Sequence, residues 1–180
     1  MAHKKTRLVK LVLSALFLSL ALLLPFLTGQ IAEIGNMLCP MHLPVLLCGF
    51  FCGPYYAALV GFIAPLMRFM LFSMPAIFPN GLAMAFELAA YGLVCGMLYR
   101  LLPKKKYNIY VSLISAMIAG RIVWGAVRTL LYGLGRSPFS WAAFLAGAFT
   151  NAIPGIIIQI IIIPVLVITV SRVFDKNTLE

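Results

Sequence analysis

The sequence predicts an all-α membrane protein, a compact bundle of six transmembrane helices with both termini on the cytoplasmic side. Three observations predict this class. The chain is 63% hydrophobic and only 10% charged, with a mean hydropathy of +1.07, whereas soluble domains are nearer half apolar. Apolar runs of about 20 residues recur along it, and basic residues collect between them. We expect residues 1–180 to form a single integral-membrane domain.

Six apolar segments approach or exceed the roughly 17 residues that a membrane-spanning helix requires. They cover approximately 8–27, 37–53, 55–72, 81–101, 107–132 and 141–170. The first follows a basic tail, as a signal peptide would. However, its run is long enough to span and no clear Ala-x-Ala cleavage site follows it. We therefore expect this helix to be retained.

Prolines and glycines indicate where the expected helices bend or end. The second segment is short and contains Pro40 and Pro44. We expect it to be kinked or partly re-entrant, which requires surrounding protein. Gly53-Pro54 predicts a tight turn before the third segment. The last segment is long, and its two prolines are expected to bend it.

The basic residues lie beside the expected spans. The net charge of +10 is compatible with nucleic-acid binding, but basic residues that flank spans are typical of cytoplasmic loops. We therefore expect the protein to lie in a lipid bilayer and not to bind nucleic acid. If the N-terminus is cytoplasmic and there are six spans, only one basic residue of the loops and tails, Arg136, lies on the outer side of the membrane. The basic residues on the cytoplasmic side are Lys4, Lys5, Arg7, Lys10, Arg100, Lys104, Lys105, Lys106, Arg172 and Lys176.

The motifs of enzymes and metal sites are missing from this sequence. Cys48 and Cys52 are four residues apart, which is not a zinc-finger spacing. There is no GxxxxGK[ST], so the chain does not hydrolyse ATP through a P-loop of its own. The serines in the spans lack a plausible general base. We expect no enzyme activity, no cofactor and no metal site.

Four ionisable residues lie inside otherwise lipid-compatible segments: Arg68, Glu87, Arg121 and Arg128. An ionised group at membrane depth costs several kcal/mol unless it has a partner, water or a ligand. One glutamate cannot neutralise three arginines, which favours an anionic ligand, and a guanidinium fits a carboxylate in bidentate fashion. Alternatively, these charges only join helices, with carbonyl groups satisfying the remainder.

Helical spacing predicts that three helix faces share this site. Arg121, Trp124 and Arg128 lie at i, i+3 and i+7, within about 60° of one another. Comparable faces occur in the 81–101 and 141–170 segments, and we expect all three to surround one cavity open to the outside. The candidate substrate-binding residues on these faces are Asn80, Glu87, Tyr91, Arg121, Trp124, Arg128, Phe144 and Asn151, with Gln159 deeper.

Two more candidates each have two interpretations. Arg68 is four residues from the outer end of its segment, so it either faces the cavity or extends to the membrane surface. His42 lies between two prolines. It is either a hydrogen-bonded structural histidine, the simpler interpretation, or a ligand contact. We include both among the candidate substrate-binding residues.

Three stretches resemble the substrate-binding S component of an energy-coupling factor (ECF) vitamin transporter. The resemblance covers nearly the whole chain. It is carried by the run 39–54 (CPMHLPVLLCGFFCGP) followed by Ala64-Pro65-Leu66, by 84–92 (MAFELAAYG), and by 120–125 (GRIVWG) with 143–149 (AFLAGAF) and Pro154-Gly155.

The resemblance implies a function and a set of partners. S components capture a vitamin and associate with a transmembrane coupling protein and two ATPase subunits that power uptake, here across a prokaryotic plasma membrane. They dock through an Ala-x-x-x-Ala pattern on the first helix, for which Ala15 and Ser19 are the nearest equivalent. The family's ligands lie toward the outside, between helices four to six and the first outer loop.

A small anionic vitamin fits the excess of arginine, and pantothenate is the leading candidate. Cobalamin, a pyridoxine-like compound and a queuosine precursor remain open. Two other functions also remain open: a ligand-free structural or assembly subunit, and a small secondary carrier. The expected roles are a carboxylate held by Arg121 and Arg128, orientation by Glu87, apolar packing by Trp124, Tyr91 and Phe144, and hydrogen bonds from Asn151 and Asn80.

Overall fold

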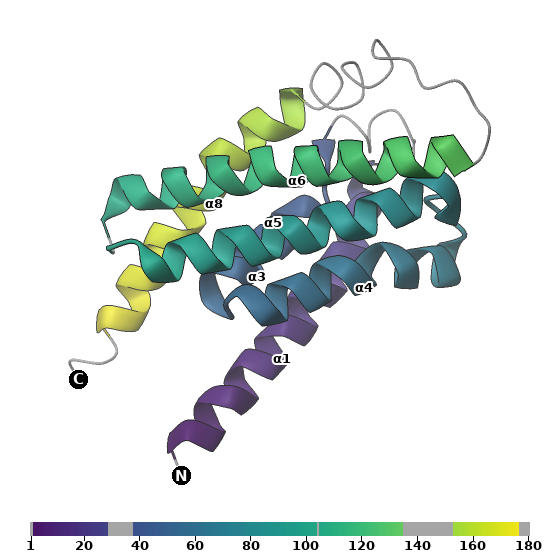
Figure 1. Cartoon of the computed structure of the whole chain (residues 1–180). Helices are drawn as coiled ribbons and strands as arrows, with labels where there is room; N and C mark the ends of the chain where they lie inside the picture. Colours follow the sequence, from purple (N-terminus) through teal and green to yellow (C-terminus); the bar gives the residue numbers. More distant parts are fainter. Residues whose placement is uncertain (1, 29–37, 104, 135–152, 177–180) are drawn as a thin grey trace.

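The computed structural model describes residues 2–28, 38–103, 105–134 and 153–176, and these residues contain helices and turns but no strand (Figure 1). The all-α class is therefore confirmed. The elements are α1 (Ala2–Leu23), a 3-10 turn (Leu24–Thr28), α3 (His42–Phe51), α4 (Pro54–Phe72), an irregular turn (Ile77–Gly81), α5 (Leu82–Leu101), α6 (Lys106–Leu134) and α8 (Ile153–Lys176).

Five helical stretches of the described chain are long and apolar enough to cross a membrane: Thr6–Leu27, Pro54–Phe72, Ile77–Leu101, Lys106–Leu131 and Ile153–Ser171. The first four match expected spans within a few residues. The beginning of the expected 141–170 span lies outside the described residues. The expected 37–53 span contains α3, which has only ten residues and is about 15 Å long. A sixth full-length span is therefore not confirmed.

Helix α3 lies inside the bundle, where it contacts α1, α4, α5 and α8. Eight of its ten residues are buried. Because protein surrounds this short helix, the polar groups at its ends are not placed in hydrocarbon. This confirms the expectation that the segment after Pro40 is covered by protein, and it brings His42 into the interior.

Helices α4, α5 and α6 run side by side, with α5 in the middle and in extensive contact with both neighbours (Figure 1). A Cβ added at Gly92 of α5 would lie 2.6 Å from the backbone carbonyl of Ala57 in α4. The missing side chain therefore allows these two helices to approach closely. Only 22% of the most apolar window of α1 and 28% of that of α8 is buried, so the described residues leave most of the surface of these two helices uncovered.

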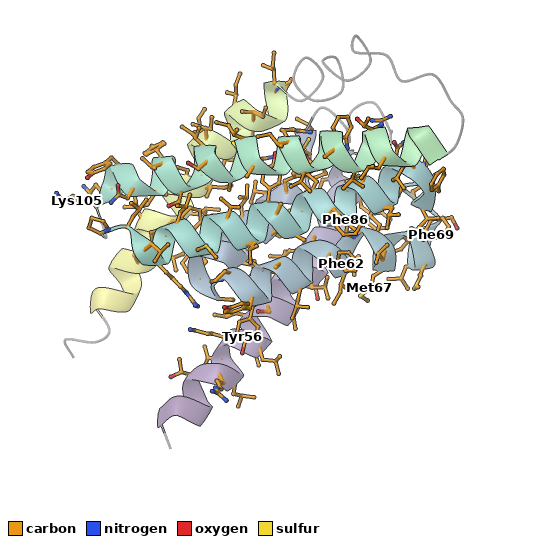
Figure 2. The ribbon with its side chains drawn as sticks, in the orientation of Figure 1. Tyr56, Phe62, Met67, Phe69, Phe86 and Lys105 are labelled. Atoms are coloured by element: carbon orange, nitrogen blue, oxygen red, sulfur yellow. The ribbon has the colours of Figure 1, made fainter. Side chains whose placement is uncertain are left out.

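Figure 2 places Lys105 between α5 and α6, on the side of the bundle where α8 also finishes (Figure 1). The predicted turn at Gly53-Pro54 is also confirmed, because Gly53 adopts a φ of 98° and α4 begins at Pro54. Arg100 at the end of α5 donates a hydrogen bond to the Cys52 carbonyl at 3.1 Å. Which side of the membrane this end faces stays a prediction.

The close approach of α4 and α5 predicts the effect of Gly92→Ala. The added methyl group meets the Ala57 backbone, which cannot rotate away, so we expect the free energy of unfolding to fall by about 1–3 kcal/mol. Unfolding in detergent micelles, followed by circular dichroism, measures this loss. Ala126→Val, on an exposed position of α6, is the matched control and should change stability little. Equal stability of the two variants would contradict the close packing.

Candidate functional site

An acidic, a basic and an imidazole side chain meet where α3, α5 and α6 converge. Glu87 of α5 is only 1% exposed. Its Oε1 lies 3.1 Å from Nη1 of Arg121 in α6 and 3.5 Å from Nε2 of His42 in α3. We call these three residues the polar cluster. The structure thus brings together three of the residues that sequence reasoning selected.

Tyr91 and Gly120 position the polar cluster. Tyr91 lies one turn after Glu87, and its ring contacts the His42 ring edge-on at a centroid distance of 5.0 Å. A Cβ added at Gly120 would collide with the Tyr91 ring. Glycine at this position therefore lets α6 pack against Tyr91, which places the adjacent Arg121 beside Glu87.

Cys39 connects the polar cluster to α8. Its Sγ accepts a hydrogen bond from Nη2 of Arg121 at 3.8 Å, and its carbonyl accepts one from Nε2 of Gln159 at 3.4 Å. Its φ of 47° lies in the left-handed region, which non-glycine residues adopt rarely and often at functional sites. Sequence reasoning did not select Cys39. The available signal was its position three residues before His42.

Several buried polar atoms of the cluster have no hydrogen-bond partner among the residues that the structure describes. They are Nδ1 and Nε2 of His42, Oε1 of Glu87 and Nε of Arg121. The Glu87 contacts are close enough for charge attraction but are not aligned as hydrogen bonds. Burying a polar atom without a partner costs about 1–3 kcal/mol, and most buried polar atoms are paired. If these side chains served only to join helices, we would expect each of these atoms to have a hydrogen-bond partner.

A second part of the site continues along α6. Trp124 is buried against Ala83, with Val127 and Leu131 packed beside them. The guanidinium of Arg128 lies over the Trp124 ring, 4.7 Å from its centroid, a cation–π contact. The candidate site therefore continues from Arg121 of the polar cluster toward the C-terminal end of α6, through Trp124 and Arg128.

The described contacts of Arg68 join α1 to α4 and contradict the interpretation in which it extends to the membrane surface, whereas its place in the binding site stays a prediction. Its Nη1 donates a hydrogen bond to the Leu22 carbonyl of α1 at 2.6 Å. Its guanidinium also lies 5.2 Å and 5.4 Å from the ring centroids of Phe26 and Phe72. Arg68 is only 4% exposed, so it does not extend to the surface. It joins the end of α1 to α4, through contacts separate from the polar cluster.

The remaining candidates are exposed or lie outside the described residues. Asn80 is exposed in the irregular turn before α5. Phe144 and Asn151 lie outside the described residues. Ala15 and Ser19, the expected docking pair, are exposed on α1, where the Ser19 hydroxyl donates to the Ala15 carbonyl at 3.0 Å. The cavity expected between three helix faces stays a prediction.

The Glu87–Arg121 contact predicts a non-additive pair of substitutions. Arg121→Met leaves a buried carboxylate without its cation, so we expect a loss of about 3–5 kcal/mol in the free energy of unfolding. Glu87→Gln combined with Arg121→Met removes both charges and should restore a large part of this loss. Denaturant unfolding in micelles measures all variants. A double variant as unstable as the sum of the single ones would show that the charges are not coupled.

The contacts of Arg68 predict a loss of stability without a loss of binding. Arg68→Met preserves much of the side-chain volume but removes the charged hydrogen bond, worth about 1.5–3 kcal/mol. Thermal unfolding should detect the loss. Met70→Ala, a 79% exposed position on the same helix, serves as control. If Arg68→Met instead abolished ligand binding in a stable protein, Arg68 would belong to the binding site.

The comparisons with known proteins identify a family. No curated protein and no solved structure matches the chain significantly. Residues 9–167, which include all the helices of the polar cluster, match the family described as "ECF transporter, substrate-specific component". This match covers most of the chain and agrees with the resemblance seen in its motifs. The chain belongs to the family of substrate-specific components of ECF transporters.

Proposed function

We propose that this S component captures a small vitamin for an ATP-driven ECF importer. The observation that carries the proposal is the polar cluster, in which buried charged and imidazole groups meet with unsatisfied hydrogen-bonding atoms. A ligand supplies the partners that these atoms otherwise lack. Members of this family are transport subunits, which supports a transport function rather than an enzymatic one.

The proposed ligand is anionic, and pantothenate is the leading candidate. Arg121 and Arg128 lie on one side of α6 with Trp124 between them, and a guanidinium binds a carboxylate through paired hydrogen bonds. Trp124 and Tyr91 provide aromatic surface for the apolar part of such a molecule. Asn80, Phe144 and Asn151 complete the proposed binding residues.

The proposed partners are the transmembrane coupling protein and two ATPase subunits. The exposed Ala15 and Ser19 of α1 are small enough to let another helix approach closely. We place the protein in a prokaryotic plasma membrane with both termini in the cytoplasm. The basic residues that flank the expected spans in the sequence support this orientation.

Isothermal titration calorimetry of the purified protein tests the proposed function. The panel contains pantothenate, cobalamin, pyridoxine and a queuosine precursor base. We expect one vitamin, with pantothenate first, to bind, and Arg121→Ala to weaken its binding at least tenfold. Ile122→Ala is the control, because Ile122 is the next residue and is 65% exposed. Unchanged affinity in Arg121→Ala would remove the polar cluster from the binding site.

Two outcomes would support the other functions. If no member of the panel binds and native mass spectrometry finds no co-purified metabolite, a ligand-free assembly subunit is favoured. If vesicles that contain this chain alone accumulate a vitamin without ATPase subunits, the protein is a secondary carrier.

A further inference from the structure

We propose that a groove between α1 and the beginning of α4 binds an anionic phospholipid of the surrounding bilayer. The groove has a volume of about 410 Å³ and is lined by Arg7, Leu8, Leu11 and Tyr56. Figure 2 shows Tyr56 on the side of α4 next to α1. The groove uses none of the residues of the polar cluster, so this proposal goes beyond the proposed function and does not depend on which substrate is captured.

The groove lies at the depth where phospholipid headgroups meet their acyl chains. The stretch of α1 that is apolar enough to span begins at Thr6, and that of α4 begins at Pro54. Arg7 and Tyr56 therefore lie within the first three residues of a span. Tyrosine is enriched at this level of a membrane, and arginine extends its guanidinium from it toward water. Leu8 and Leu11 are 61% and 59% exposed and provide an apolar wall for an acyl chain.

Two further cations lie beside the groove. Arg100 donates a hydrogen bond from Nη2 to the Cys52 carbonyl at 3.1 Å, just before α4 begins. Lys10 lies close enough to the Cys52 thiol for the two groups to interact electrostatically. Both carboxylate contacts that the structure describes involve Glu87, so Arg7 and Lys10 have no carboxylate partner among the described side chains. This excess of positive charge favours an anionic headgroup over a zwitterionic one.

The size and lining of the groove favour a lipid over a partner helix or a free phosphate ion. Its volume is about that of one turn of a helix with its side chains, whereas a helix docked along α1 needs room for several turns. Two of its four lining residues are leucines and a third is a half-buried tyrosine. A free phosphate gains nothing from such walls. The first part of an acyl chain buries its CH₂ groups against them.

Native mass spectrometry tests the proposal on protein in a mild detergent with phosphatidylglycerol and phosphatidylcholine in equal amounts. We expect the wild type to bind phosphatidylglycerol at least tenfold more tightly. Each basic residue near an anionic headgroup contributes a factor of about five, so Arg7→Gln combined with Lys10→Gln should weaken phosphatidylglycerol binding at least tenfold. Lys105→Gln combined with Lys106→Gln is the matched control. It removes the same charge at the beginning of α6 and should weaken binding less than twofold.

A second pair of variants tests the groove itself. Leu11→Trp fills the groove but keeps every cation, so it should weaken phosphatidylglycerol binding at least fivefold, whereas a site for free phosphate would keep its affinity. Val12→Trp adds the same bulk at a 60% exposed position that does not line the groove and should preserve binding. Thermal unfolding of each variant distinguishes lost affinity from lost structure. If Leu11→Trp is unstable, the two charge variants decide the proposal.

The outcomes separate this proposal from the proposed function. Equal binding of the two lipids, equal losses in the two charge variants, or full binding in a stable Leu11→Trp would each overturn it. A partner chain that co-purifies in place of the lipid and is lost in Leu11→Trp would assign the groove to a protein and also overturn it. Calorimetry with the vitamin panel should give the same affinity for the wild type and for Arg7→Gln combined with Lys10→Gln, so either proposal can fail while the other stands.

Discussion

The arrangement of the helices depends on the buried contact between Glu87 and Arg121. Removing either charge from water is costly, so the pair is stable only if the two side chains meet at close range. The packing that achieves this is built from small residues. Gly120 admits the Tyr91 ring against α6, and Gly92 admits the backbone of α4 against α5. Close packing of α5 on α6 therefore brings the ion pair within range, and α4 packs on α5 from another side.

The three intramembrane arginines are stabilised in three different ways. Arg121 has a carboxylate, Arg68 has a carbonyl group and two aromatic rings, and Arg128 lies over an indole ring. An excess of cations in the sequence is therefore not equivalent to an excess of positive charge at one point. This distinction separates Arg121, whose charge a carboxylate neutralises, from Arg68, whose charge joins α1 to α4.

Incomplete hydrogen bonding gives the polar cluster its functional interest. A fully satisfied network would make the interior rigid, whereas unsatisfied donors and acceptors favour a ligand that completes them. Strong discrimination between similar ligands arises from such atoms, because an incorrect ligand leaves them unpaired. The strained backbone of Cys39, which contacts both Arg121 and Gln159, connects this cluster to α8.

The sequence by itself determined the all-α class, most span positions, the shared face of Arg121, Trp124 and Arg128, and the family. These properties depend on local composition and periodicity, which neighbouring residues carry. Only the tertiary structure decided that His42 meets Glu87, that Arg68 binds α1, and that α3 is a short buried helix. Arg68 and Leu22 are 46 residues apart, and Arg121 and Cys39 are 82 apart. No local pattern encodes such contacts, because they arise from how whole helices pack.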